Sequence, residues 1–168
     1  MKKTVENIFA ESIAVKQATL TKGLPQIVGA AQAVLTAFKG GHKVFFFGNG
    51  GSAADSQHIA AEFIGRFQKE RKSWPAIALT TDTSILTALG NDYNFDIVFA
   101  RQLEGLGQKG DVAFAISTSG NSKNVLAGVK QAKAMGMTTI GVTGGTGGAL
   151  LSVCDIAVVA ASSKTARI

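Results

Sequence analysis

Apolar residues recur at every third or fourth position over the first forty residues, which is the spacing of a helix face. Val5, Ile8, Phe9 and Ile13 follow this spacing within residues 4–21, and a second apolar series fills residues 24–39. The segment Gly23–Pro25 separates the two series and is typical of a break followed by a helix start. The pattern therefore predicts an N-terminal helical hairpin over residues 1–40. Because both helices look apolar on more than one face, we expect the hairpin to pack against other copies of the chain.

Beyond residue 41, short apolar runs alternate with stretches of helical spacing. Strands are predicted at 43–47, 76–79, 112–116, 138–142 and 156–159, and helices at 52–67, 84–89, 96–106 and 124–134. Strands that alternate with helices indicate a parallel sheet that is covered on both faces. Residues 41–168 are thus expected to form one α/β domain, a three-layer sandwich with a five-stranded parallel sheet of flavodoxin-like topology. Ligands of such folds gather at the carboxyl ends of the strands.

The composition indicates a folded protein, and its basic balance suits an anionic small molecule. Hydrophobic residues make up 46% of the 168 residues and charged residues 17%, and the formal charge is +6. The basic residues are scattered, and the one dense run, 66–72, is more typical of a solvated helix end than of a nucleic-acid site. The single cysteine, Cys154, lies among apolar residues and suits a buried structural thiol in a reducing, cytoplasmic setting. No apolar stretch is long enough to cross a membrane without interruption.

The run Ser117–Ser122 is the most informative segment for function. It lies between a predicted strand and a predicted helix, so four hydroxyl groups stand on a strand-to-helix turn. The free N–H groups of a helix start attract anions, hydroxyls add donors without bulk, and Gly120 lets the backbone approach a ligand closely. These features predict a phosphate site. The lysine of the nucleotide P-loop pattern is missing, which disfavours a nucleoside triphosphate.

A second loop, Gly48–Ser52, follows the first predicted strand and is rich in small residues. It does not complete the dinucleotide pattern G-x-G-x-x-G, because Ala53 stands where a third glycine belongs. Together with Ser117–Ser122 it suggests one site built from two loops. Residues 144–148 form a third glycine-rich loop, which is either another wall of the site or a flexible connection.

Two further polar groups are candidates for chemistry. His58 and Glu62 are four residues apart on one predicted helix, where they can bind one zinc ion or transfer a proton, or simply form a surface pair. Asn91, beside Asp92, can bind a sugar hydroxyl, but either residue can equally cap the next helix.

These residues resemble the sugar isomerase (SIS) domain, and more closely the phosphoheptose isomerases. The resemblance spans essentially the whole chain and is carried by Phe47–Ser52, Gln57–His58 with Glu62, Gly65–Arg66, Pro75–Ala78, Gly90–Asp92, Gly110–Asp111, Ile116–Ser122, Thr143–Gly144 and Ala166–Ile168. It implies conversion of D-sedoheptulose 7-phosphate to D-glycero-D-manno-heptose 7-phosphate through an enediol, in the supply of heptose for lipopolysaccharide or other surface glycans. It also implies a homotetramer in which the first helices pack as a central bundle.

The same resemblance implies a role for each candidate residue. Ser117, Thr118, Ser119 and Ser122 would hold the phosphate, and the sugar would be lined by Asn49, Gly50, Gly51, Asn91 and Asp92. Glu62 would be the catalytic base and, with His58, a ligand of one zinc ion per subunit.

The resemblance departs from the family pattern after Ile168. Family members continue into a helix that supplies a glutamine and a histidine to the zinc site, and neither is in this sequence. Either the native protein continues into such a helix, which we favour, or this form is crippled. For the 168-residue form we expect an incomplete metal site, with weak zinc binding and little activity. The competing interpretation is a non-catalytic SIS tetramer that binds the replication initiator protein, in which a small residue stands in the place of Glu62. A phosphosugar-sensing regulator is disfavoured because the sequence has no helix-turn-helix pattern.

Overall fold

The computed structural model describes residues 1–168 and opens with one long helix, α1, over Lys2–Lys39. The predicted hairpin is therefore wrong, because α1 continues through Pro25 without a turn. A proline inside a helix removes one backbone hydrogen bond. Reversing the chain would instead leave the last carbonyls of one helix and the first N–H groups of the next without partners. The helix is also attached to the domain before Pro25, since the Thr19 hydroxyl accepts a 2.9 Å hydrogen bond from the Ala161 N–H just after β5.

The sheet has five parallel strands in the order β2-β1-β3-β4-β5, as predicted for a flavodoxin-like domain. The strands are β1 Val44–Gly48, β2 Ala76–Ala78, β3 Val112–Ile116, β4 Thr138–Gly144 and β5 Ile156–Ala160. All five residues of β1 are buried, because helices cover both faces of the sheet.

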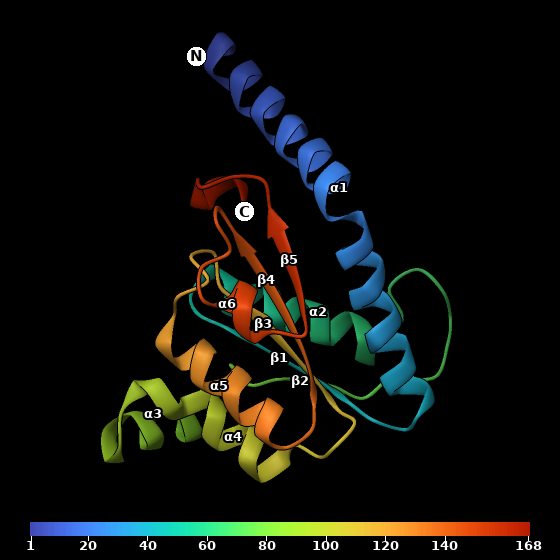
Figure 1. Ribbon diagram of the computed structural model, residues 1–168, viewed down its shortest axis with the longest axis vertical. Coiled ribbons are helices and arrows are strands. Elements are labelled where there is room, and N and C mark those ends of the chain that lie inside the picture. The colour runs from blue at the N-terminus through green and yellow to red at the C-terminus, as the bar shows by residue number, and fades with distance from the viewer.

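The remaining helices complete two covering layers, which Figure 1 shows on opposite sides of the sheet. They are α2 Gly51–Ile64, α3 Thr83–Asp92, η1 Phe95–Ile97, α4 Val98–Leu106, α5 Lys123–Ala134, α6 Leu150–Val153 and η2 Thr165–Arg167. Alternating residues of β1 serve the two layers: Phe45 and Phe47 face the α4/α5 core, while Phe46 faces the α1/α2 core. The predicted helix over 96–106 is divided into η1 and α4.

The N-terminal half of α1 extends beyond the sheet (Figure 1). It carries a series of exposed apolar side chains, namely Val5, Ile8, Phe9, Ile13 and Leu20. Between α1, α2 and the sheet lies a cavity of about 440 Å³ that is lined only by hydrophobic side chains. No helix combines the length and the hydropathy that crossing a membrane requires.

The end of the chain returns to α1. Glu11 forms ion pairs with Lys164 and Arg167 from the segment that follows β5. The hydrogen bond from Lys164 holds the pKa of the Glu11 carboxyl below its usual value.

Cys154 is a half-buried structural thiol that contacts the backbone of β4. A Cβ atom at Gly141 would lie 2.8 Å from its Sγ atom. Burial, helped by the nearby Asp155 carboxylate, raises the pKa of the thiol to about 11. The thiol is therefore protonated at neutral pH, when it is a poor nucleophile.

Candidate functional site

The two predicted ligand loops meet at the point where the strand order reverses. Strands β1 and β3 are neighbours, and Gly48 at the end of β1 pairs in register with Ile116 at the end of β3. The approach is close, since a Cβ atom on Gly48 would lie 2.7 Å from the Ile116 carbonyl oxygen. In sheets of this order, the crevice beyond these two strand ends is the usual ligand site.

The serine turn, Ser117–Ser122, brings hydroxyl groups and backbone N–H groups to this crevice. The Oγ atoms of Ser117 and Ser122 lie 3.0 Å apart, and Ser117 is buried. Ser122 is the N-cap residue of α5, yet its hydroxyl accepts no hydrogen bond from its own helix. The N–H groups of Ser122, Lys123 and Asn124 have no acceptor in the protein. Free N–H groups and hydroxyls at the start of a twelve-residue helix are well suited to bind a phosphate.

The loop after β4 supports the serine turn from behind. The Gly144 N–H donates to the Thr118 carbonyl at 3.1 Å, and the Leu150 N–H donates to the Gly120 carbonyl at 3.0 Å. Gly120 has a φ of +67°, and a Cβ atom there would lie 2.0 Å from the Gly147 carbonyl oxygen. Residues 144–150 thus hold the shape of the turn, which answers the question that the sequence left open about this glycine-rich loop.

Asn124 links the serine turn to the loop Gly48–Ser52, which contains Asn49. The sequence pattern did not identify Asn124 as a site residue. Its side-chain amide forms two reciprocal hydrogen bonds with the amide of Asn49, each 2.8 Å long. Asn124 is 4% exposed, whereas Asn49 is exposed. The available signal was an asparagine two residues after Ser122, in the first turn of a helix, where an amide can bridge to a neighbouring loop.

His58 and Glu62 lie together on α2, as their spacing predicts. The His58 Nε2 and Glu62 Oε1 atoms are 3.6 Å apart, and the side chains are 75% and 38% exposed. They line a cavity of about 530 Å³ with Phe67, Trp74 and neighbouring residues. Arg66 lies beyond the end of α2 and pairs with Glu70 at 3.7 Å, so it does not neutralise Glu62.

The structure keeps Glu62 and the serine turn of one protomer far apart. Glu62 lies eleven residues beyond Gly51, the first residue of α2, which corresponds to about 16 Å of helix. Its carbonyl accepts a hydrogen bond from the Arg71 guanidinium, in the segment that leads into β2. In Figure 1, α2 runs from the carboxyl ends of the strands, where the serine turn lies, toward their amino ends. The Glu62 carboxylate and the serine turn therefore lie at opposite ends of the domain.

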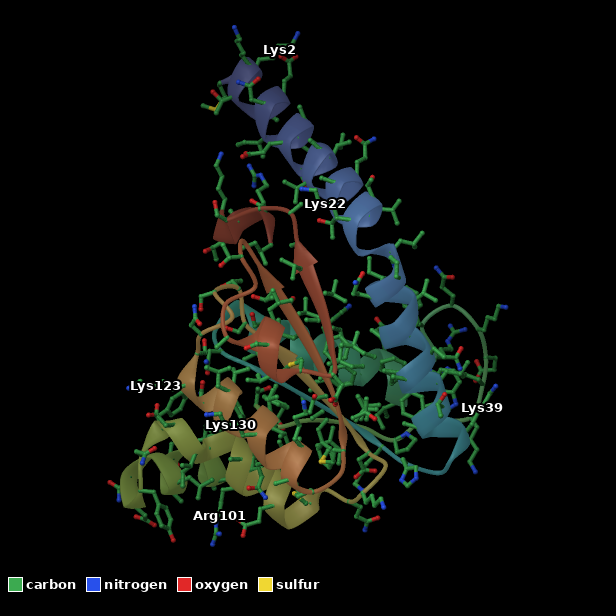
Figure 2. The ribbon with its side chains drawn as sticks, in the orientation of Figure 1. Lys2, Lys22, Lys39, Arg101, Lys123 and Lys130 are labelled. Carbon is green, nitrogen blue, oxygen red and sulfur yellow. The ribbon has the colours of Figure 1, made fainter.

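Asn91 and Asp92 lie in the last turn of α3, where the Asn91 amide donates to the Asp92 carboxylate at 2.9 Å. Neither residue caps the following helix, because Asn94 accepts the N–H of Asp96 at the start of η1. Further along, Asp96 lies 4.0 Å from the Lys123 ammonium, just after the serine turn. Figure 2 shows Lys123 at the start of α5, well apart from the lysines of α1.

The donor set for a metal ion is only partly assembled. His58 and Glu62 are close enough to share one ion, since zinc binds imidazole nitrogen and carboxylate oxygen at about 2.0–2.2 Å. No group of three or more His, Cys, Asp or Glu residues converges anywhere in the chain. The two residues fit part of a zinc site.

Comparison with known proteins decides the family. The SIS domain model matches residues 8–144. A phosphoheptose isomerase from Aquifex aeolicus is 55% identical over 168 residues, which is all of this chain and 88% of that protein. The chain belongs to the phosphoheptose isomerase family of SIS-domain proteins.

Solved structures agree with this assignment. A phosphoheptose isomerase from Neisseria gonorrhoeae superposes with a TM-score of 0.92 at 44% identity, covering 99% of this chain and 89% of that chain. The corresponding enzyme from Francisella tularensis gives 0.93 at 38% identity, covering 98% and 88%. These relatives confirm the predicted SIS fold and support the enzyme over the replication-initiator-binding protein.

Proposed function

We propose that the protein is a phosphoheptose isomerase that interconverts D-sedoheptulose 7-phosphate and D-glycero-D-manno-heptose 7-phosphate in the cytoplasm, in the supply of heptose for surface glycans. The observation that carries the proposal is the serine turn at the strand-order reversal, in a chain 55% identical to a phosphoheptose isomerase. The direct test is turnover of sedoheptulose 7-phosphate by the purified protein, for which the incomplete metal site leads us to expect a low but measurable rate.

The residues divide the work by their chemistry. The hydroxyls of the serine turn and the N–H groups at the start of α5 bind the phosphate. Asn49 and the backbone of Gly50 and Gly51 line the sugar from the neighbouring loop, together with Asn91 and Asp92. The isomerisation moves a proton between C1 and C2 through an enediol, which requires a base beside that edge of the sugar. Glu62 is the carboxylate that serves this purpose.

The separation of Glu62 from the serine turn leads us to a site shared between copies of the chain. In a heptose 7-phosphate only a seven-carbon chain separates the carbonyl end from the phosphate. The serine turn and the Glu62 carboxylate of one protomer lie at opposite ends of the domain, which is too far apart for one substrate molecule to reach both. Association of protomers, which we propose to be a homotetramer, supplies Glu62 from one copy to the phosphate turn of another. The exposed apolar series on α1 provides the surface for this association.

Subunit mixing tests the shared site. Ser119→Asp places a carboxylate on the exposed phosphate turn, and Glu62→Gln removes the base, so each homo-oligomer should be nearly inactive. The two variants are co-expressed with different tags, and mixed oligomers are isolated through both tags. Random pairing of subunits gives about a quarter of the sites both native residues, so about a quarter of the wild-type activity should return. Mixed oligomers as inactive as their parents would contradict the shared site, and a monomeric protein would contradict the assembly.

His58 and Glu62 are further proposed to contribute two ligands to a divalent metal, with zinc the ion that suits them. When bound, such an ion supplies Lewis-acid polarisation of the substrate carbonyl. The residues themselves hold the imidazole and the carboxylate side by side on one face of α2.

Zinc titration followed by calorimetry tests this donor pair. Because only two donors converge, this chain should bind zinc on the order of micromolar or more weakly, well short of the affinity of complete structural sites. His58→Ala should remove the binding, whereas His42→Ala, at the other histidine of the chain, should leave it intact. Nanomolar affinity, or binding that survives His58→Ala, would contradict the proposed ligand pair.

A further inference from the structure

Asn124 connects the two ligand loops through a buried amide. Its Oδ1 atom accepts from the Asn49 Nδ2 group at 2.8 Å and also from the Val125 N–H at 2.9 Å. Its own Nδ2 group donates back to the Asn49 Oδ1 atom at 2.8 Å. The side chain is 4% exposed, so water competes little for these hydrogen bonds.

These contacts determine which way the Asn49 amide is turned. The Val125 N–H can face only an acceptor, which fixes the oxygen of the Asn124 amide on that side. The Asn124 Nδ2 group must then face Asn49, and it requires the Asn49 oxygen opposite it. A rotation of the Asn49 amide by half a turn would set two N–H donors against each other and two oxygens against each other.

The orientation matters because the Asn49 amide has capacity left for a ligand. The pair with Asn124 uses one of its two N–H groups and one lone pair of its oxygen. The remaining N–H group and lone pair belong to an exposed side chain beside the serine turn. An amide that is already turned correctly loses little entropy when it binds a sugar hydroxyl.

We propose that Asn124 is a positioning residue that holds the Asn49 amide in the orientation required by the sugar of the bound substrate. The proposal rests on the isomerase function above. It adds to the site a side chain that does not itself touch the substrate, and it couples the sugar-binding loop to the first turn of the helix that binds the phosphate.

A double-mutant cycle on the full chain tests the proposal. Asn49→Ala, Asn124→Ala and the double variant are assayed with sedoheptulose 7-phosphate. If Asn124 acts through Asn49, each single variant should lose about tenfold or more in kcat/KM, and the double variant should be no worse than Asn49→Ala alone. The inhibition constant of glycerol 3-phosphate, which probes the phosphate turn without the sugar, should stay within about twofold of the wild type in Asn124→Ala.

A control separates positioning from loss of stability. Thr139 is also buried, and its hydroxyl donates a 2.7 Å hydrogen bond to Asp155. It lies near the start of β4, at the amino ends of the strands, whereas the candidate site lies at their carboxyl ends. Thr139→Val should lower the melting temperature as Asn124→Ala does, with kcat/KM unchanged.

The outcomes distinguish the proposal from the function on which it rests. A wild-type protein without turnover would overturn the isomerase function and the positioning role with it. An active wild type in which the two asparagine effects multiply would overturn the positioning role alone, as would a weaker inhibition by glycerol 3-phosphate that parallels the loss of kcat/KM.

Discussion

Glu62→Gln should lower kcat for sedoheptulose 7-phosphate by about 10²–10⁴-fold, with little change in KM. The amide has nearly the size and shape of the carboxylate but cannot take the proton that moves between C1 and C2. The phosphate turn lies at the other end of the domain and is untouched, so substrate binding should persist. Steady-state kinetics, with thermal melting as a check on folding, measures the effect.

A neighbouring carboxylate provides the matched control for this variant. Glu70 is exposed and forms a similar i,i+4 pair, with Arg66 at 3.7 Å, just beyond the end of α2. Glu70→Gln removes the same charge from the same region and should retain wild-type kcat. If Glu62→Gln also turned over at the wild-type rate, Glu62 could not be the base.

Gly120→Ala should both destabilise the protein and weaken substrate binding. Gly120 has a φ of +67°, and the added Cβ atom would lie 2.0 Å from the Gly147 carbonyl oxygen. The left-handed backbone costs about 1–2 kcal/mol for an alanine, and the overlap adds about 1–3 kcal/mol. Relief of this overlap moves the serine turn away from residues 144–150, so KM should rise by tenfold or more. Denaturant unfolding and kinetics measure the two effects.

Gly145→Ala separates backbone strain from the overlap. Gly145 has a similar φ of +59°, but its nearest neighbour to an added Cβ atom is 3.8 Å away. This variant should lose only the left-handed penalty of about 1–2 kcal/mol and keep its KM. Equal effects from the two variants would mean that contact with Gly147 does not shape the phosphate turn.

The alternation of apolar strands and amphipathic helices was sufficient to predict the parallel sheet and its two covering layers. The reason is local: five short apolar runs between helices can be buried only in a sheet covered on both faces. The serine turn was equally predictable, because hydroxyls, a glycine and a helix start are contiguous at Ser117–Ser122. At Pro25 the local signal was misleading, since a long helix tolerates one lost hydrogen bond.

By itself, then, the sequence determined the α/β class, the serine turn and the pairing of His58 with Glu62, because each depends on residues that are neighbours along the chain. Only the tertiary structure decided that the Asn124 amide pairs with the amide of Asn49, 75 positions away, and that residues 144–150 support the turn. It also decided that Glu62 lies at the far end of the domain from that turn. These relations depend on which strands become neighbours and on which end of the sheet each helix reaches, and local spacing specifies neither.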